Sequence, residues 1–202
     1  EFIVNDLVNK LGKEVLATYN IKKLVLSNLK IVDRSLFENN TSLKELELRE
    51  GLQEIKNSAF KNVKLEKLTL PKSLKIIDAK AFENCGLSKG INFGASKNLE
   101  IWDEAFANND FTTLNISAVA DIKNDNVFAG CANITNISMH EDTILPKFFY
   151  AKGLLASRFV LRNIFIPKSL YDYIGDVSWV NGMNYKIASL EEWYKFFCTN
   201  TH

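Results

Sequence analysis

The sequence predicts a solenoid, a stack of similar coils, because two kinds of apolar residue recur along it at nearly one spacing. Apolar pairs separated by one residue recur at steps of 22, 22, 23, 23, 23 and 27 residues: Leu24/Leu26, Leu46/Leu48, Leu68/Leu70, Ile91/Phe93, Leu114/Ile116, Ile137/Met139 and Ile164/Ile166. A series of Phe residues runs in phase with these pairs at steps of 23, 22, 24, 22 and 21 residues: Phe37, Phe60, Phe82, Phe106, Phe128 and Phe149. A shared period of roughly 20 to 29 residues is typical of stacked repeat proteins.

Each apolar pair predicts one short strand, because alternation with period two marks a strand with one buried face. A strand whose equivalent lies 22 residues later must return by a crossover, so neighbouring strands should be parallel. The crossover carries further apolar positions in phase with the Phe series: Leu36, Ala59, Ala81, Ala105 and Val127 before the Phe, and Val32, Ile55, Ile77 and Ile101 five residues before it. The expected fold class is a leucine-rich-repeat solenoid, a right-handed α/β superhelix of about seven 22-23-residue repeats with one short parallel strand each.

The two ends of such a stack need lids, because a terminal coil has no neighbour on one side. A helical cap is expected over residues 1–20, where apolar residues follow helical spacing: Val4, Leu7, Val8, Leu11 and Val15. A second helix is expected over residues 188–202, where Ser189 and Glu192 form a capping box. The solenoid then spans residues 21–187, with a closing segment from about 164.

Composition argues against several classes of partner. The 25 Lys and Arg residues nearly balance the 24 Asp and Glu residues, and a net charge of +1 gives no reason to expect nucleic acid. No apolar run approaches the ~20 residues of a membrane-spanning helix, so no membrane insertion of this segment is expected. The three Cys residues lie too far apart in sequence for a paired-cysteine zinc motif.

No pattern in the sequence predicts catalysis. Only two His residues occur, and the run His140-Glu141-Asp142 lacks the spacing that places two metal ligands on one helix face. Neither of the glycine-rich motifs that hold phosphates occurs, so no nucleotide cofactor is implied. We therefore expect no catalytic, metal-binding or cofactor-binding residues, and a protein that is not an enzyme.

Two cysteines occupy equivalent places, since Cys85 and Cys131 each follow their Phe by three residues, two repeats apart. Strands stack about 4.8 Å apart, so the two residues should lie roughly 10 Å apart. A disulfide needs Cα atoms within about 7 Å. Both are expected to be free, buried thiols, and Cys198 is expected to react first with thiol reagents.

The run from Leu70 to Cys85, LPKSLKIIDAKAFENC, resembles the repeat of the BspA-type leucine-rich-repeat family, which reads roughly I-P-x-S-V-x-x-I-G-x-x-A-F-x-x-C. The run from Ile164 to Leu170, followed by Tyr173, Trp179 and Ile187, resembles the closing segment of that family. The resemblance covers roughly residues 21 to 187, and Asp78 departs from it by standing where the family has Gly. It implies a secreted or cell-surface protein that serves adhesion or partner binding and has no activity of its own.

The residues beside the inward-facing pairs should form an open face of the strand sheet, in rows of three per repeat. One column begins Lys23, Glu45, Lys67, an alternation of charge that favours this register. Between the fourth and sixth repeats the face becomes polar and uncharged, which suits hydrogen bonding to a partner. The predicted binding residues are Asn92, Thr113, Asn115, Asn136, Ser138 and His140.

Three functions remain open at this stage. The first is a binding or adhesion module that recognises a protein. The second is a glycan-binding module, which would require exposed aromatic side chains on the open face, where only Phe165 is predicted. The third is a targeting fragment of a larger enzyme, which would require further domains in the full protein. The partner is expected to be a protein or glycan, and its identity does not follow from the sequence.

Overall fold

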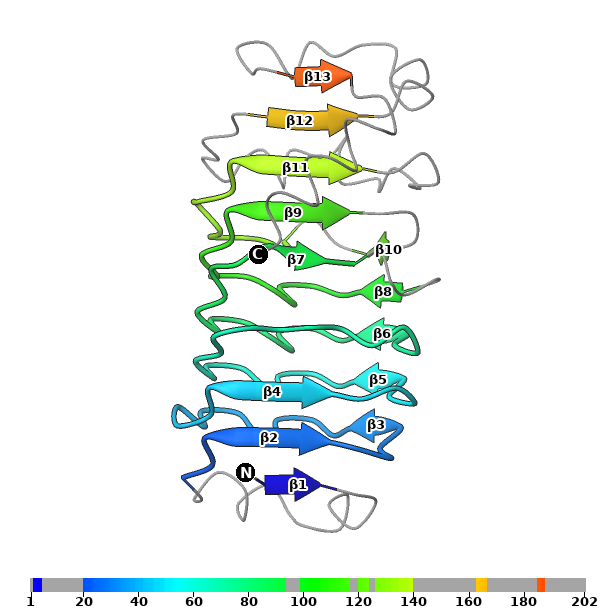
Figure 1. The fold of residues 1–202 in the computed structure, drawn as a ribbon, viewed down its shortest axis with the longest axis vertical. Coiled ribbons are helices and arrows are strands. Elements are labelled where there is room, and N and C mark those ends of the chain that lie inside the picture. Colours follow the sequence, from blue (N-terminus) through cyan, green and yellow to red (C-terminus); the bar gives the residue numbers. More distant parts are fainter. Residues whose placement is uncertain are drawn as a thin grey trace.

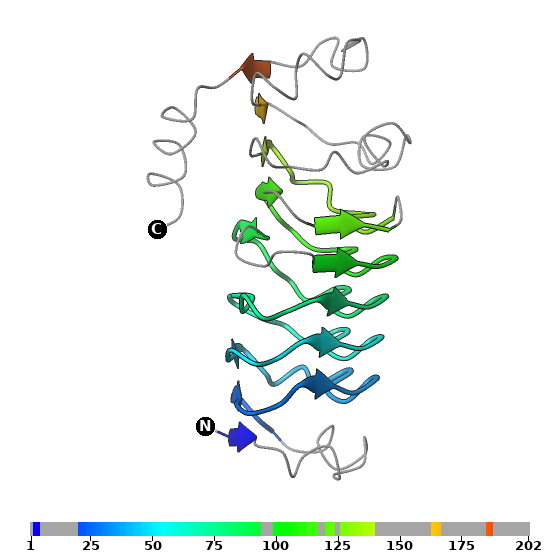
Figure 2. The ribbon, with the colours of Figure 1, turned by 90° about the vertical axis from the view of Figure 1, so that its right-hand side faces the viewer.

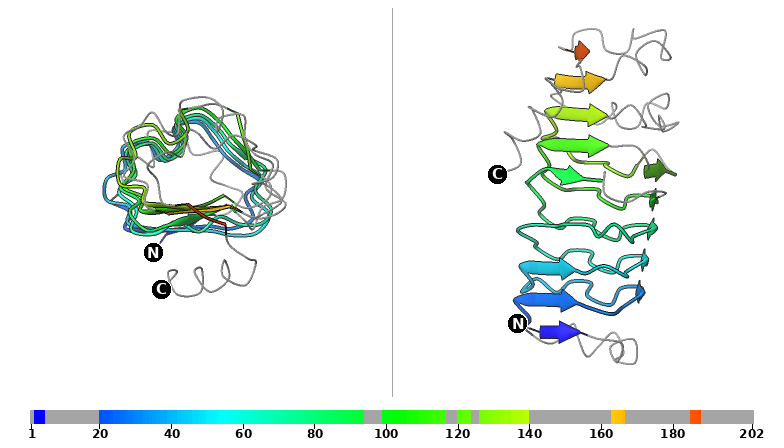
Figure 3. Two further views of the ribbon diagram at one scale, coloured as in Figure 1. Left: turned by 90° about the horizontal axis from the view of Figure 1, so that it is seen from above. Right: turned by 45° about the vertical axis from the view of Figure 1, so that its right-hand side comes forward.

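The computed structural model describes residues 2–4, 20–93, 99–116, 120–123, 126–139, 163–166 and 185–187. These residues form a stack of short parallel strands that run across the long axis of the molecule (Figure 1). Seen from above, successive coils superimpose on one another around a shared interior (Figure 3). The stacked coils confirm the predicted leucine-rich-repeat fold.

Six of the seven predicted strands form, lie on one side of the stack and pair in parallel. With two further strands, β1(Phe2–Val4) and β13(Tyr185–Ile187), they make two sheets: β1, β2(Lys23–Leu26) and β4(Glu45–Leu48), and then β7(Ile91–Asn92), β9(Thr113–Ile116), β11(Asn136–Met139), β12(Asn163–Ile166) and β13. The strand predicted at Leu68/Leu70 does not form, since the third repeat contributes only the isolated bridge between Glu45 and Lys67. Within them the apolar pairs stand in register, with Leu24 opposite Leu46 and Leu114 opposite Ile137. The 22- and 23-residue steps therefore correspond to one coil of the solenoid. We call this side of the stack the open face.

The expectation of one strand per repeat is wrong, because a second parallel sheet lies on another side of the coil (Figure 2). It is made of β3(Ile31–Val32), β5(Glu54–Ile55), β6(Ile76–Ile77), β8(Leu99–Ile101) and β10(Ala120–Ile122). Val32, Ile55 and Ile77 are 0% exposed and point inward from this sheet. In β3, β5 and β6 a buried aliphatic residue stands next to a more exposed one, as the two-residue period of a strand requires. The crossovers of neighbouring coils therefore pair with one another as short strands. The described crossovers therefore contain strands and turns, and the α/β description does not apply to them.

The predicted caps fall largely outside the described residues. Residues 5–19 and 188–202 are not described, so neither helix is tested. The first described segment, β1, lies within the range expected for the N-terminal helix but pairs in parallel with β2, with Phe2 opposite Leu24. At least residues 2–4 of that range therefore extend the sheet of the open face.

The Phe series forms the centre of the core. The rings of Phe37, Phe60, Phe82 and Phe106 stack in sequence, with centroids 5.3, 5.3 and 5.4 Å apart and planes 5° to 13° from parallel. Phe128 continues the stack at 5.9 Å from Phe106. Every ring in this stack is at most 2% exposed. The predicted core series is thus confirmed for the described repeats, while Phe149 lies outside them.

The turns around the Phe residues form a third row of hydrogen bonds between neighbouring coils, in addition to the two rows of strands. The backbone N–H of each Phe donates to the carbonyl of the residue before the next Phe, as in Phe82 N to Ala105 O at 2.8 Å. Two residues after each Phe the backbone is left-handed, with φ between 54° and 65° at Asn39, Asn62, Asn84 and Asn108. Asn tolerates this conformation better than most residues. Here the side chains also join neighbouring coils, because the Asn62 amide donates to Asn39 and the Asn84 amide to Asn62, both at 2.8 Å.

Three residues after each Phe of the ring stack lies a buried side chain, and in three repeats this side chain bonds to the preceding coil. The thiols of Cys85 and Cys131 donate to the carbonyls of Phe60 and Phe106, at 3.0 and 3.2 Å. At the equivalent position in the repeat between them, the Asn109 amide donates to Phe82 O at 2.8 Å and its oxygen accepts from the backbone of Cys85. Both cysteines are free and buried, as expected.

Candidate binding face

The open face carries a row of exposed side chains at the second repeat. Glu45, Glu47 and Arg49 point outward from β4 and its end, and all three are exposed. The Arg49 Nε donates to the Glu47 carboxylate at 2.8 Å, which fixes the two side chains side by side. The predicted charge column also stands in register, since Lys23 lies opposite Glu45. The ion pair between them, at 3.9 Å and largely exposed, adds little stability.

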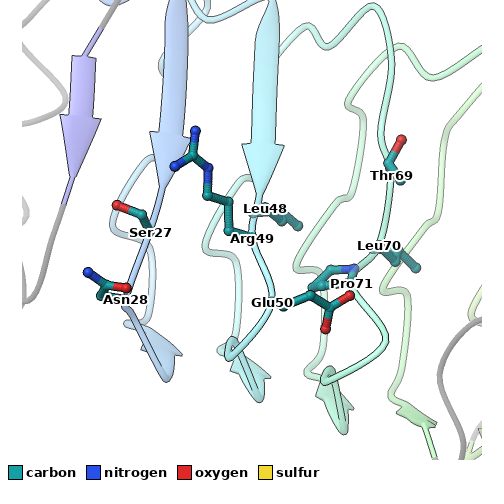
Figure 4. A pocket seen from close by; sticks show the side chains of 8 residues that line it. All are labelled: Ser27, Asn28, Leu48, Arg49, Glu50, Thr69, Leu70 and Pro71. Carbon is teal, nitrogen blue, oxygen red and sulfur yellow. The ribbon is translucent and has the colours of Figure 1, made fainter.

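An open depression of about 610 Å³ lies where the strands of the first three repeats end. It is lined by Ser27, Asn28, Leu48, Arg49, Glu50, Thr69, Leu70 and Pro71. In Figure 4 the Arg49 guanidinium extends between β2 and β4, and the Glu50 carboxylate lies close to Pro71. This depression does not follow from the sequence, because its lining is assembled from three repeats.

Glu50 shapes one wall of this depression by capping the turn of the next repeat. Its carboxylate accepts hydrogen bonds from the backbone N–H groups of Lys72 at 2.9 Å and Ser73 at 3.1 Å. The bond from Lys72, followed by that from Ser73, lowers the pKa of Glu50 below its usual value. The carboxylate therefore stays charged at neutral pH and is engaged in the fold.

The six residues predicted to bind a partner are only partly described. The strand register places their backbones in two columns, Thr113 beside Asn136 and Asn92 beside Asn115 beside Ser138. Thr113 and Asn136 are half-buried, and the Asn136 amide donates to Thr135 Oγ1 at 3.0 Å. Asn115 is only 3% exposed, so its side chain is not accessible to a docking partner in this arrangement. The structure describes Asn92 and Ser138 by their backbone alone, and His140 lies outside the described residues.

Several charged side chains of the described residues form ion pairs within the fold. Glu104, which follows Asp103 in a paired-carboxylate pattern, binds Lys80 at 2.9 Å and raises the pKa of Lys80 by this hydrogen bond and by its charge. In the described ranges, no three His, Cys, Asp or Glu side chains gather as they would around a metal ion. Within the same part of the chain, no helix has the length and apolar character needed to span a membrane.

The two described thiols should be unreactive in the folded protein. Burial raises the pKa of Cys85 to about 12 and that of Cys131 to about 11, which disfavours the reactive thiolate. We expect iodoacetamide at pH 8 to leave both unmodified until denaturant unfolds the chain, with Cys198 modified first. Mass spectrometry of digested protein, labelled with and without denaturant, measures this order. Labelling of Cys85 in the native protein at the rate of an exposed thiol would contradict its burial.

Stacked coils with one parallel strand sheet on an open face and a continuous Phe core define a leucine-rich-repeat protein. The family model described as "BspA type Leucine rich repeat region" matches residues 1–88 and 64–186, in 6 copies. The chain therefore belongs to the BspA-type leucine-rich-repeat family. No curated protein matches it.

Solved structures with the same architecture include the pneumococcal vaccine antigen PcpA, with a TM-score of 0.61 and 20% identity, covering 85% of this chain and 42% of that chain. A leucine-rich repeat protein from Bacteroides ovatus has a TM-score of 0.49 and 18% identity, covering 74% of this chain and 44% of that chain. A leucine rich cell surface protein from Faecalibacterium prausnitzii has a TM-score of 0.37 and 15% identity, covering 90% and 64%. The chain thus spans less than half of PcpA, and at 20% identity the likeness shows the fold alone.

Proposed function

We propose that this chain is a non-catalytic binding module that recognises a protein partner on its open face. The observation that carries the proposal is the exposed row Glu45, Glu47 and Arg49 beside an open depression, on a sheet held rigid by parallel pairing. Side chains on such a sheet lose little conformational freedom when a partner docks, and regular solenoid faces are common binding surfaces. The charged row suits a protein surface that carries complementary charges.

The proposed contact surface continues along the sheet to the two accessible members of the predicted strip, Thr113 and Asn136. Asn92, Ser138 and His140 remain part of the proposal as positions on or beside the same strands. Asn115 is assigned a structural role, because its side chain is 3% exposed.

Location at the cell surface or outside the cell is part of the same proposal. It is supported by membership of the BspA-type family and by the likeness to a pneumococcal vaccine antigen.

The test measures binding of this chain to a panel of purified surface proteins by biolayer interferometry. For a partner that binds, Arg49→Ala combined with Thr113→Ala and Asn136→Ala is expected to raise Kd at least about tenfold, as loss of central interface contacts does. Lys75→Ala is the matched control, because Lys75 is exposed away from the open face and makes no side-chain ion pair in the described structure. Equal affinity of the triple variant and the control would refute the proposed face.

A glycan ligand is the second candidate, and one observation favours it. Trp102 is 43% exposed, the only large hydrophobic side chain so exposed among the described residues. It follows β8 in the second sheet, at the ladder position where Asp33, Lys56 and Asp78 stand in the preceding repeats. Exposed indole rings stack on sugar rings. Binding on a glycan array that is lost in Trp102→Ala and kept in the open-face triple variant would favour this candidate.

A further inference from the structure

One residue directly follows each strand of the five-stranded second sheet and continues its register. From the second repeat onward, the backbone N–H of this residue donates to the last strand residue of the preceding coil, at 2.9–3.0 Å. Neighbouring strands lie about 4.8 Å apart, so the side chains at this position stand next to one another along the stack. We call them the outer column, which runs Asp33, Lys56, Asp78, Trp102 and Lys123.

Opposite charges pair between neighbouring coils on this sheet. The Lys56 Nζ lies 3.1 Å from the Asp33 carboxylate. Two coils further along the outer column, the Lys123 Nζ lies 3.4 Å from the carboxylate of Glu100 in β8. In both pairs the Lys belongs to the coil that follows the acid. The regular arrangement of charge on this sheet is therefore an acid balanced by a base one coil later.

Asp78 is the acid of the outer column that lacks such a base. Its carboxylate accepts backbone N–H bonds from Ala79 at 2.7 Å and from Asn57 at 3.1 Å, and within the described residues it makes no ion pair. Where the earlier pair has a Lys, the coil after Asp78 has Trp102. Each carboxylate oxygen has room for a second hydrogen bond. The column thus has a place for a cation that the chain itself does not fill.

Trp102 makes this place suitable for a cation. Its side chain is 43% exposed, and in the described part of the chain it makes no hydrogen bond and no contact with another aromatic ring. The face of an indole ring attracts cations more strongly than that of Tyr or Phe. On the far side of Trp102, the charge of Lys123 is offset by its pairing with Glu100. The ring and the Asp78 carboxylate therefore favour the same kind of ligand.

We propose that Trp102 and Asp78 bind the guanidinium group of an arginine on a protein partner. The planar guanidinium stacks on the indole ring while its N–H groups donate to the carboxylate, whereas a Lys ammonium is a compact point charge. A neutral sugar also stacks on an indole ring, but it does not balance the charge of Asp78. The site lies on the second sheet, away from the open face, so this interaction surface is independent of the proposed function (Figure 2).

The test titrates the whole isotope-labelled chain with the peptide acetyl-Gly-Ser-Arg-Ser-Gly-amide and follows backbone amide shifts by NMR. The matched ligand has citrulline in place of arginine, which keeps nearly the same shape and removes the charge. Two variants change the exposed ring alone. Trp102→Leu removes the aromatic face, and Trp102→Lys supplies Asp78 with a cation from the chain itself. The dispersion of each spectrum shows that the variant is folded.

Amide shifts around Asp78 and Trp102 are expected to saturate, with a Kd about threefold lower for the arginine peptide than for the citrulline peptide. Trp102→Leu should raise the Kd of the arginine peptide by about the same factor, and Trp102→Lys should abolish the saturable shifts at Asp78. The open-face triple variant, which keeps both residues, should bind this peptide as the wild-type chain does, so the two proposals are judged separately.

Three results would overturn the arginine site. The first is equal affinity for the two peptides, or no saturable shift near Trp102 with either. The second is undiminished binding of the arginine peptide to the Trp102→Lys variant. The third is tighter binding of methyl glucoside than of the arginine peptide at Trp102, which would assign the ring to a sugar ligand.

Discussion

Replacing Phe82 by Ala is expected to lower the free energy of unfolding by about 3–5 kcal/mol, the range for removing a buried aromatic ring and leaving a cavity. The Phe82 side chain is 0% exposed and stacks on Phe60 at 5.3 Å and on Phe106 at 5.4 Å. Its loss therefore interrupts the ring stack in the middle of the solenoid. Because each coil is stabilised mainly by its neighbours, the two halves should then unfold with less cooperativity.

Urea denaturation followed by circular dichroism measures the change in stability and the sharpness of the transition. Trp102→Ala is the matched control, because it removes a larger aromatic side chain that is 43% exposed, and it should cost about 1 kcal/mol or less. If Phe82→Ala cost no more than this control, the stacked rings would not be the core that holds the coils together.

Asn109→Ala should produce the second large effect, a loss of about 2–4 kcal/mol. Asn109 is 1% exposed, and its oxygen accepts from the backbone N–H groups of Cys85 and Leu87, both at 3.1 Å. Its amide donates to Phe82 O at 2.8 Å and to Phe106 O at 2.9 Å. Alanine would leave two buried N–H donors without an acceptor, and each such group costs about 1–3 kcal/mol.

The same denaturation measurement applies, with Asn133→Ala as the control. Asn133 is exposed and makes one long bond, to Asp110 at 3.4 Å, so its replacement should change stability by less than about 0.5 kcal/mol. Similar values for the two variants would mean that solvent satisfies the donors that Asn109 now satisfies.

The sequence predicted the repeat and its phase well because both depend on the spacing of buried side chains. Leu24, Leu46 and Leu114 are buried in the strands where the two-residue period placed them, and Phe37 to Phe128 form the expected series. The free thiols of Cys85 and Cys131 followed from the same geometry, since residues two coils apart are too distant for a disulfide.

The second sheet was not predicted, although its inward residues had been identified. Val32, Ile55 and Ile77 recur singly in the sequence, each within a strand of only two residues. One apolar residue does not establish a two-residue period, so the strand becomes evident only when neighbouring coils supply its hydrogen-bond partners.

The candidate site was less predictable than the core. Outward-facing positions could be assigned from alternation, and Glu45, Glu47 and Arg49 are exposed as expected. Asn115 occupies the equivalent kind of position and is 3% exposed, so alternation along the strand does not by itself decide exposure. The depression at the strand ends likewise combines Ser27, Arg49 and Thr69 from three coils.

What the sequence by itself determined is the coil: its length of about 22 to 23 residues, its inward-facing residues and its parallel stacking on neighbours. Only the tertiary structure decided where adjacent coils join and where they do not. The strands of the open face form two separate sheets, whereas the second sheet is continuous and the Phe turns bond across the same repeats. Side-chain periodicity is a property of one strand, whereas pairing requires two strands in contact, and that contact exists only in the folded stack.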